Sequence, residues 1–158
     1  MSAEARLREL GIHLPDARPA AGNYIPFRRH GDLLFLAGQG ADGHVGRVGD
    51  TMTLEEGQAA ARAAGLNLLT QTRAALGTLD AVEEVVRVHG WVSCADGFTQ
   101  IPAVVNGASD LFVEVFGDAG RHARTAVGVW MLPLGFAVEV EMIVAVRDGA
   151  GGAYRHAL

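Results

Sequence analysis

The chain is poor in the residue types that mark several large protein classes. It has one cysteine, Cys94, in 158 residues, which excludes an intrachain disulfide and fits a reducing compartment. Aromatic residues make up only 6%, and 13 lysines and arginines face 18 aspartates and glutamates, a formal net charge of −5. Proteins that bind nucleic acid usually carry a basic surface, often with aromatic residues for stacking. We therefore do not expect nucleic acid as a partner.

Long apolar runs are also missing. No stretch approaches the roughly 18 consecutive apolar residues of a membrane-spanning helix, so no membrane association is expected. The first residues, Met-Ser-Ala-Glu-Ala-Arg, lack the apolar core of a signal peptide, and we expect a cytoplasmic protein. The six histidines show neither H-x-H nor H-E-x-x-H spacing, so no metal site is predicted.

The apolar residues of the chain are mostly small or aliphatic. Hydrophobic residues make up 49% of the chain, and a length of this size is most simply one domain over residues 1–158. Because the apolar content is high for so small a surface, we expect part of it to be buried between subunits.

The order of predicted elements gives the fold class. A helix over residues 3–10 and a Pro/Ala-rich connector occupy residues 1–22, and strands are predicted at 27–29 and 33–37. Thr53 and Glu56 form a capping box that begins a helix over 54–76, ended by Gly77. A helical turn at 79–84, a strand at 85–93, a second long helix at 102–116 and two final strands follow, with a loose tail over 148–158. This order predicts an α+β protein whose mixed sheet has two long helices on one face.

We expect the last two strands to pair through a tight connection at Leu132-Pro133-Leu134-Gly135. Period-2 alternation puts Val138, Val140, Met142, Val144 and Val146 on a buried face and Glu139 and Glu141 on the other. The same reasoning puts Arg124 on the face of the two glutamates. In a paired register Arg124 and Glu139 lie about four residues, or roughly 13 Å, apart. A site using both would then combine two subunits more easily than one.

Five residues are candidates for chemistry, and each has a structural alternative. Arg124 offers a planar cation suited to a carboxylate, or an interface ion pair. Glu139 and Glu141 can supply an acid or base, with repulsion raising one pKa, or can simply face solvent. Tyr24 can line a pocket or pack on the surface. Cys94 fits a buried structural thiol better than a nucleophile.

A glycine pattern, Gly38-Gln39-Gly40-Ala41-Asp42-Gly43, matches G-x-G-x-x-G after a strand. A dinucleotide site needs these glycines to open directly into a helix. Here another glycine-rich loop follows and the next predicted helix begins about ten residues later, so we reject a dinucleotide-binding role.

Several short motifs, in order and nearly at family spacing, resemble the RidA/YjgF family in its longer-chain branch. They are Gly22-Asn23-Tyr24, Leu36-Ala37-Gly38-Gln39, Val105-Asn106, His122-Ala123-Arg124-Thr125-Ala126-Val127, Leu132-Pro133 and Val138-Glu139-Val140-Glu141. The resemblance covers residues 24–146. It implies a chorismate-mutase-like fold of the bacillus type and a homotrimer with ligand clefts between subunits.

The activity implied by the resemblance is hydrolytic deamination of 2-imino or enamine acids to 2-oxo acids and ammonia, without a cofactor. Arg124 would grip the substrate carboxylate and Glu139 would place the water. Tyr24, Gly38, Ala37 and Asn106 would line the substrate site, although Ala37 stands where typical deaminases have a serine. The rival functions are a non-catalytic protein that binds a small carboxylate in the same cleft and, less favoured, an endoribonuclease.

Overall fold

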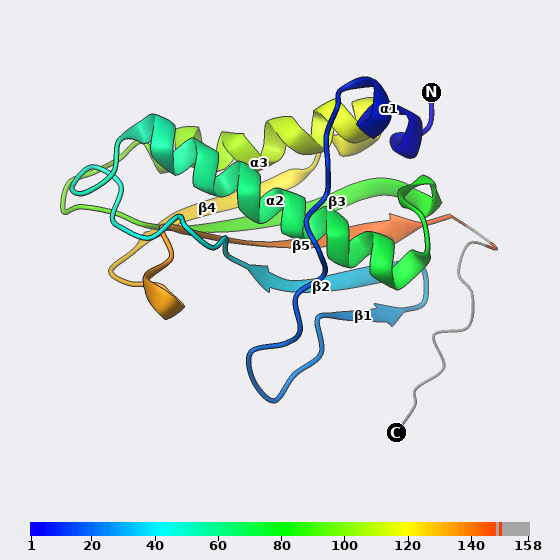
Figure 1. Ribbon diagram of the computed structural model, residues 1–158, viewed down its shortest axis with the longest axis horizontal. Coiled ribbons are helices and arrows are strands. Elements are labelled where there is room, and N and C mark those ends of the chain that lie inside the picture. The colour runs from blue at the N-terminus through cyan, green and yellow to red at the C-terminus, as the bar shows by residue number, and fades with distance from the viewer. Residues whose placement is uncertain (148, 150–158) are drawn as a thin grey trace.

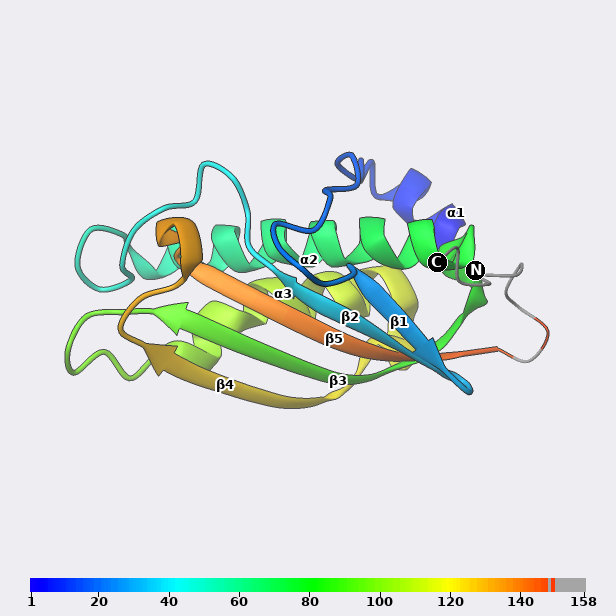
Figure 2. The same cartoon turned by 90° about the horizontal axis from the view of Figure 1, so that it is seen from below.

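The computed structural model describes residues 1–147 and 149, and its sheet has five strands in the order β1-β2-β5-β3-β4 (Figures 1 and 2). The strands are β1 (Phe27–His30), β2 (Leu33–Gln39), β3 (Val82–Ser93), β4 (Ala123–Val129) and β5 (Val138–Val146). The helices are α1 (Ala3–Glu9), α2 (Leu54–Leu76) and α3 (Ile101–Phe116), with short 3-10 turns η1 (Leu79–Ala81), η2 (Gly117–Gly120) and η3 (Pro133–Gly135). The predicted tail lies outside the described residues, apart from Gly149.

Two long helices, α2 and α3, cover one face of the sheet (Figure 1). The alternation predicted for β5 is confirmed: every second residue from Val138 to Val146 is buried, while Glu139, Glu141, Ile143 and Ala145 are only partly covered. The buried set packs with α2 and α3 into one hydrophobic core, so the α+β prediction with two helices on one face is correct. No helix of the described residues lies over the opposite face, which we call the open face (Figure 2).

The predicted pairing of the last two strands is wrong. β4 runs parallel to β3, and β5 runs antiparallel to the other side of β3, so β3 separates the two strands. The connection between them crosses the end of β3, where the Cys94 N–H donates to the Val129 carbonyl and the Ser93 N–H to that of Ala137. Leu134 adopts a positive φ of 58° in this connection. The Pro-Gly break is therefore a crossover and does not form a hairpin.

Local signals place α2 as predicted. The Thr53 side chain accepts from the Glu56 N–H and the Glu56 side chain accepts from the Thr53 N–H, and Gly77 ends the helix with φ 80°. The predicted helical turn at 79–84 is shorter than expected. Only Leu79–Ala81 is 3-10 helix, and β3 begins at Val82, where it pairs with Val146.

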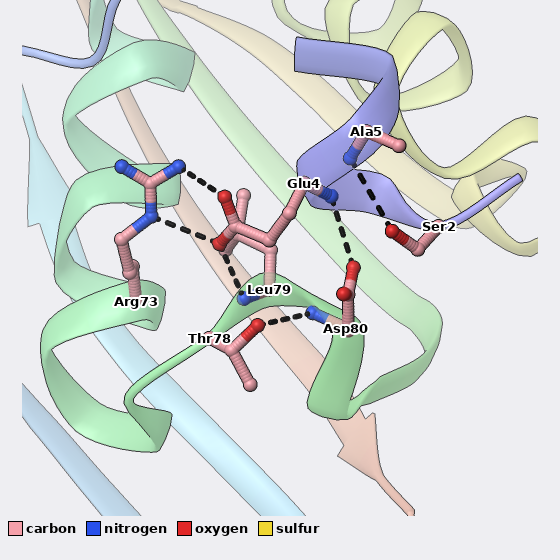
Figure 3. Close-up of polar contacts among 7 residues, drawn as sticks. All are labelled: Ser2, Glu4, Ala5, Arg73, Thr78, Leu79 and Asp80. Atoms are coloured by element: carbon pink, nitrogen blue, oxygen red, sulfur yellow. Dashed lines mark hydrogen bonds and ion pairs between the residues drawn. The ribbon is translucent and has the colours of Figure 1, made fainter. Parts of the chain in front are cut away.

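An ion pair holds α1 to the body of the protein (Figure 3). The Glu4 carboxylate accepts from Arg73 Nε and Nη2 at 3.0 and 2.6 Å and from the Leu79 N–H at 2.9 Å. Asp80 in turn accepts from the Glu4 N–H at 2.9 Å. The connector that follows α1 runs across α2 toward β1 (Figure 1) and carries the next part of the chain to the edge of the sheet.

Candidate functional site

Arg124 lies near the start of β4, and α3 fixes its guanidinium. Nη1 donates to Asn106 Oδ1 at 2.8 Å and to Ser109 Oγ at 3.1 Å, and Nη2 donates to the Pro102 carbonyl at 3.1 Å. The three acceptors share one face of α3 because they are spaced at i, i+4 and i+7. Arg124 and Asn106, both predicted as site residues, are thus brought together.

These contacts leave part of the guanidinium free to bind a ligand. Arginine has five N–H groups, and three of them are used by α3. The Nε–H and one Nη2–H have no partner among residues 1–147 and 149. Nε and Nη2 lie on the same edge of the guanidinium, the edge that can bind a carboxylate through two parallel hydrogen bonds. The arrangement therefore presents an oriented carboxylate receptor at the surface.

A histidine fixes the orientation of the Ser109 hydroxyl. The His122 Nδ1 lies 2.6 Å from the Gly120 carbonyl and its Nε2 lies 2.9 Å from Ser109 Oγ. Because a carbonyl only accepts, Nδ1 carries the proton and Nε2 of the neutral ring accepts from the serine. Burial, with a further contribution from Arg124, lowers the pKa of His122 from its usual value. The neutral ring therefore leaves the serine lone pairs directed at Arg124.

Glu139 is the candidate acid or base, and it lies against the end of β2. A methyl group built on Gly38 would come within 2.3 Å of Glu139 Oε1, so only glycine lets the carboxyl approach this backbone so closely. Burial, with a smaller contribution from the neighbouring Glu141 carboxylate, raises the pKa of Glu139. A carboxyl with a raised pKa can exchange protons closer to neutral pH than an ordinary one.

Tyr24 and Gly38 line a cavity of about 320 Å³, a volume at the lower end of the range for small-molecule sites. The Tyr24 hydroxyl accepts from the Ala21 N–H at 3.2 Å, and the ring is half exposed. Ala37, beside Gly38, donates its N–H to the Pro26 carbonyl at 2.8 Å and has no side-chain polar group to offer. Tyr24, Ala37, Gly38 and Glu139 thus form a second group of predicted residues.

The two groups are far apart in one chain. Arg124 pairs with Val88, which pairs with Met142, so Glu139 lies three residues along and two strands across from Arg124. With usual strand spacings the two Cα atoms are roughly 14 Å apart.

They also point to opposite faces, which corrects the prediction that they share one. Arg124 lies on the helix face because it aligns with the buried Val88 and contacts α3. Glu139 lies on the open face between the buried Val138 and Val140. The face prediction fails because alternation assigned the two faces of β4 the wrong way round: Val127 is exposed, and the small Gly128 lies against Ile101 of α3.

Comparison with known proteins decides the family. A family model described as "YjgF/chorismate mutase-like, putative endoribonuclease" matches residues 4–145. The chain belongs to this YjgF/chorismate mutase-like family. Protein TCP17 of Trypanosoma cruzi is 45% identical over 150 residues, covering 91% of this chain and 94% of that protein.

Solved structures of similar proteins confirm the YjgF fold. Atu1372 from Agrobacterium tumefaciens, a protein of unknown function, is 38% identical with a TM-score of 0.85 and covers 92% of both chains. A "putative endoribonuclease" from Shewanella oneidensis is 33% identical with a TM-score of 0.89, covering 92% of this chain and all of that one. These similarities establish the YjgF family and fold without naming a substrate.

Three residues of the site were not predicted from the sequence. They are Ser109, which contacts Arg124, His122, which contacts Ser109, and Arg18. The spacing of Pro102, Asn106 and Ser109 along the predicted second helix was a usable signal, since it places all three on one face of that helix. Nothing comparable marks Arg18, which reaches the Tyr24 cavity from an irregular connector.

Within residues 1–147 and 149, no three or more His, Cys, Asp or Glu side chains gather closely enough to hold a metal ion. None of the helices in that part of the YjgF-family chain has the length and apolar character needed to span a bilayer.

Proposed function

We propose that this YjgF-family protein hydrolyses reactive 2-imino or enamine acids to 2-oxo acids and ammonia, at sites made by two copies of the chain. The observation that carries the proposal is the guanidinium of Arg124. Three contacts from α3 fix it and leave the Nε–H and one Nη2–H for a carboxylate. When the guanidinium binds the substrate carboxylate, the adjacent C=N carbon lies at a fixed distance from Arg124.

The reaction needs a water and a group that handles its proton. Water adds to the C=N carbon while the Glu139 carboxylate takes a proton from it, and the protonated carboxyl returns a proton to the nitrogen. The carboxylate next takes the hydroxyl proton of this carbinolamine and passes it to the amino nitrogen, so that the C–N bond breaks, the C=O bond forms and ammonia leaves. The raised pKa of Glu139, caused first by burial, suits a group that must both accept and donate a proton near neutral pH. No cofactor takes part in these steps.

Assembly of two copies would bring the two groups together. β4 is an edge strand with a free side in the described part of the chain, and the open face is not covered by a helix. Apolar side chains are exposed on this face and on the crossover beside it: Phe35, Val127, Trp130, Met131 and Leu134. Exposed apolar surface of this kind favours association. A homotrimer, as the family resemblance implies, would repeat the two-chain site three times.

Release of ammonia and 2-oxo acid from freshly generated imines tests the proposal. Wild type should accelerate release above the spontaneous rate, and Arg124→Ala should abolish the acceleration. Arg121→Ala is the matched control, since Arg121 is an exposed arginine that pairs only with Asp118 in the described residues, and it should leave the rate unchanged. Absence of acceleration by wild type for every imine would refute the deaminase proposal.

The second candidate is a non-catalytic protein that binds a small carboxylate at Arg124. The same fixed guanidinium supports it, because binding needs the carboxylate receptor but not Glu139. Calorimetry with a 2-oxo acid separates the two: binding lost in Arg124→Ala, without any imine hydrolysis by wild type, would favour this role. Some relatives are described as endoribonucleases. The net charge of −5 disfavours RNA binding and therefore this activity. RNA cleavage that survives Arg124→Ala would support that activity instead.

A further inference from the structure

A second arginine reaches the cavity that Tyr24 and Gly38 line. Arg18, from the connector between α1 and β1, contributes to the wall of this 320 Å³ space. The other lining residues are uncharged, among them Tyr24, Gly38, Gly40, Leu134 and Phe136. Among the lining residues Arg18 alone is charged, and the Glu139 carboxyl lies beside the Gly38 wall.

The Arg18 guanidinium is well placed but has few partners. Its Nη2 pairs with Asp42 Oδ2, and its Cζ lies 5.9 Å from the ring centroid of Phe136. The remaining N–H groups have no partner within residues 1–147 and 149. The Arg18 side chain is 31% exposed and that of Asp42 is 79% exposed. An ion pair with so exposed a carboxylate is weak, so it leaves Arg18 able to bind another anion.

The backbone that carries Arg18 is fixed by polar contacts from α2. The buried Gln71 donates from Nε2 to the Arg18 carbonyl at 2.8 Å, and Thr70 donates to the Pro15 carbonyl at 2.9 Å. Asn67, one helical turn earlier, donates from Nδ2 to the Gly40 carbonyl at 2.7 Å, so the same helix face holds the opposite wall of the cavity. The position of Arg18 relative to Gly40 is thus set by α2.

We propose that Arg18 binds a second carboxylate at the end of the substrate side chain, so that the protein prefers imines of acidic amino acids. This inference rests on the proposed function, which places the substrate beside Tyr24 and Gly38. Arg124 of one copy would hold the carboxylate next to the reacting carbon, and Arg18 of the other copy would hold the distal one. Phe136 and Leu134 supply apolar walls for the carbon chain between them.

Norvaline and glutamate form a matched pair for the test, because their five-carbon chains end in a methyl group and a carboxylate. Their imines, generated in place by an amino-acid oxidase, should show a higher kcat/KM for the glutamate imine with wild type. A charge-assisted hydrogen bond at a partly exposed site accounts for about a tenfold to hundredfold preference. Arg18→Gln should lose this preference, so that kcat/KM for the glutamate imine falls to that for the norvaline imine, and its melting temperature shows that the variant folds.

Three further variants test whether the charge of Arg18 causes the preference for the acidic imine. Asp42→Asn removes the competing carboxylate and should increase the preference for the acidic imine. Arg18→Lys keeps the charge and should retain part of that preference. Arg8→Gln removes an exposed cation on α1 and should change nothing, which controls for the loss of one positive charge. An unchanged preference in Arg18→Gln, or no preference in wild type, would overturn the inference.

Binding of the two 2-oxo acid products distinguishes failure of the Arg18 inference from failure of the proposed deaminase function. Calorimetry compares 2-oxoglutarate with 2-oxopentanoate on wild type and Arg18→Gln. If wild type hydrolyses neither imine, tighter binding of 2-oxoglutarate that is lost in Arg18→Gln still supports a distal carboxylate site, while the deaminase proposal fails. Equal binding of the two acids by wild type would contradict the Arg18 site whatever the enzyme assay shows.

Discussion

Replacing Gly38 with alanine should damage catalysis far more than stability. The added methyl would lie 2.3 Å from Glu139 Oε1, 3.1 Å from its Cδ and 3.2 Å from its Cγ, so the Glu139 side chain must turn away. The φ of Gly38 is not positive, and alanine adds no backbone strain. Glu139 is only partly covered, so its side chain can shift at a cost of about 0.5–1.5 kcal/mol if it leaves its preferred rotamer.

The catalytic cost is larger because Glu139 is the proposed proton acceptor. Removing a positioned acid or base typically costs about a hundredfold to ten-thousandfold, so the kcat of Gly38→Ala with an imine should fall at least about a hundredfold. The melting temperature should fall by only a few degrees, as about 1 kcal/mol implies. Gly22→Ala is the control: its methyl would meet the Tyr24 ring at an ordinary 3.6 Å, and kcat should be retained.

A double variant decides whether the methyl acts through Glu139. Glu139→Gln alone should lose about as much activity as Gly38→Ala, and the double variant should lose little more, because both changes remove the same function. Additive losses, or a Gly38→Ala enzyme with normal kcat, would refute the reasoning.

Three shorter predictions concern stability. Burial first, and then Glu141, raise the pKa of Glu139 above 4.5, so the folded protein holds this proton more tightly than the unfolded chain. The unfolding free energy should therefore fall as pH rises from about 4.5 through the raised value, and Glu139→Gln should remove that slope in urea titrations. Burial lowers the pKa of His122 below 6.5, so stability should be lost as pH falls from 6.5 through the lowered value, and His122→Gln should flatten that limb. Glu4→Gln weakens the contacts with Arg73 and should cost about 1–3 kcal/mol without changing kcat; an unchanged unfolding free energy would show that α1 is anchored by packing instead.

Local signals in the sequence were sufficient for most elements. The capping box at Thr53 and Glu56 and the stop at Gly77 place α2 within its observed bounds, because caps act on the residues beside them. The alternation of β5 predicted its buried face, since the apolar residues at every second position must all be covered. The order of helices and strands then gave the fold class.

Pairing between distant strands was not predictable in the same way. The sequence between β4 and β5 resembles a hairpin connection, yet β3, from a distant part of the chain, lies between them. That placement depends on the whole sheet. The face of Arg124 was wrong for a separate reason: the small Gly128 of β4 packs against α3, and the larger Val127 is left exposed. Arg124 and Glu139 were still predicted as site residues from their chemistry, and Asn106 and Gly38 from the family motifs.

The central claim is that Arg124 and Glu139 act together across two copies of the chain. The most direct test mixes equal amounts of Arg124→Ala and Glu139→Gln chains by joint refolding, and measures ammonia release from an imine. Each variant alone should be inactive. If each site takes its arginine from one copy and its glutamate from the next, random assembly restores about a quarter of the sites, and with them about a quarter of wild-type activity. If the mixture is as inactive as its components while wild type is active, the two residues belong to one chain's site and the account is wrong.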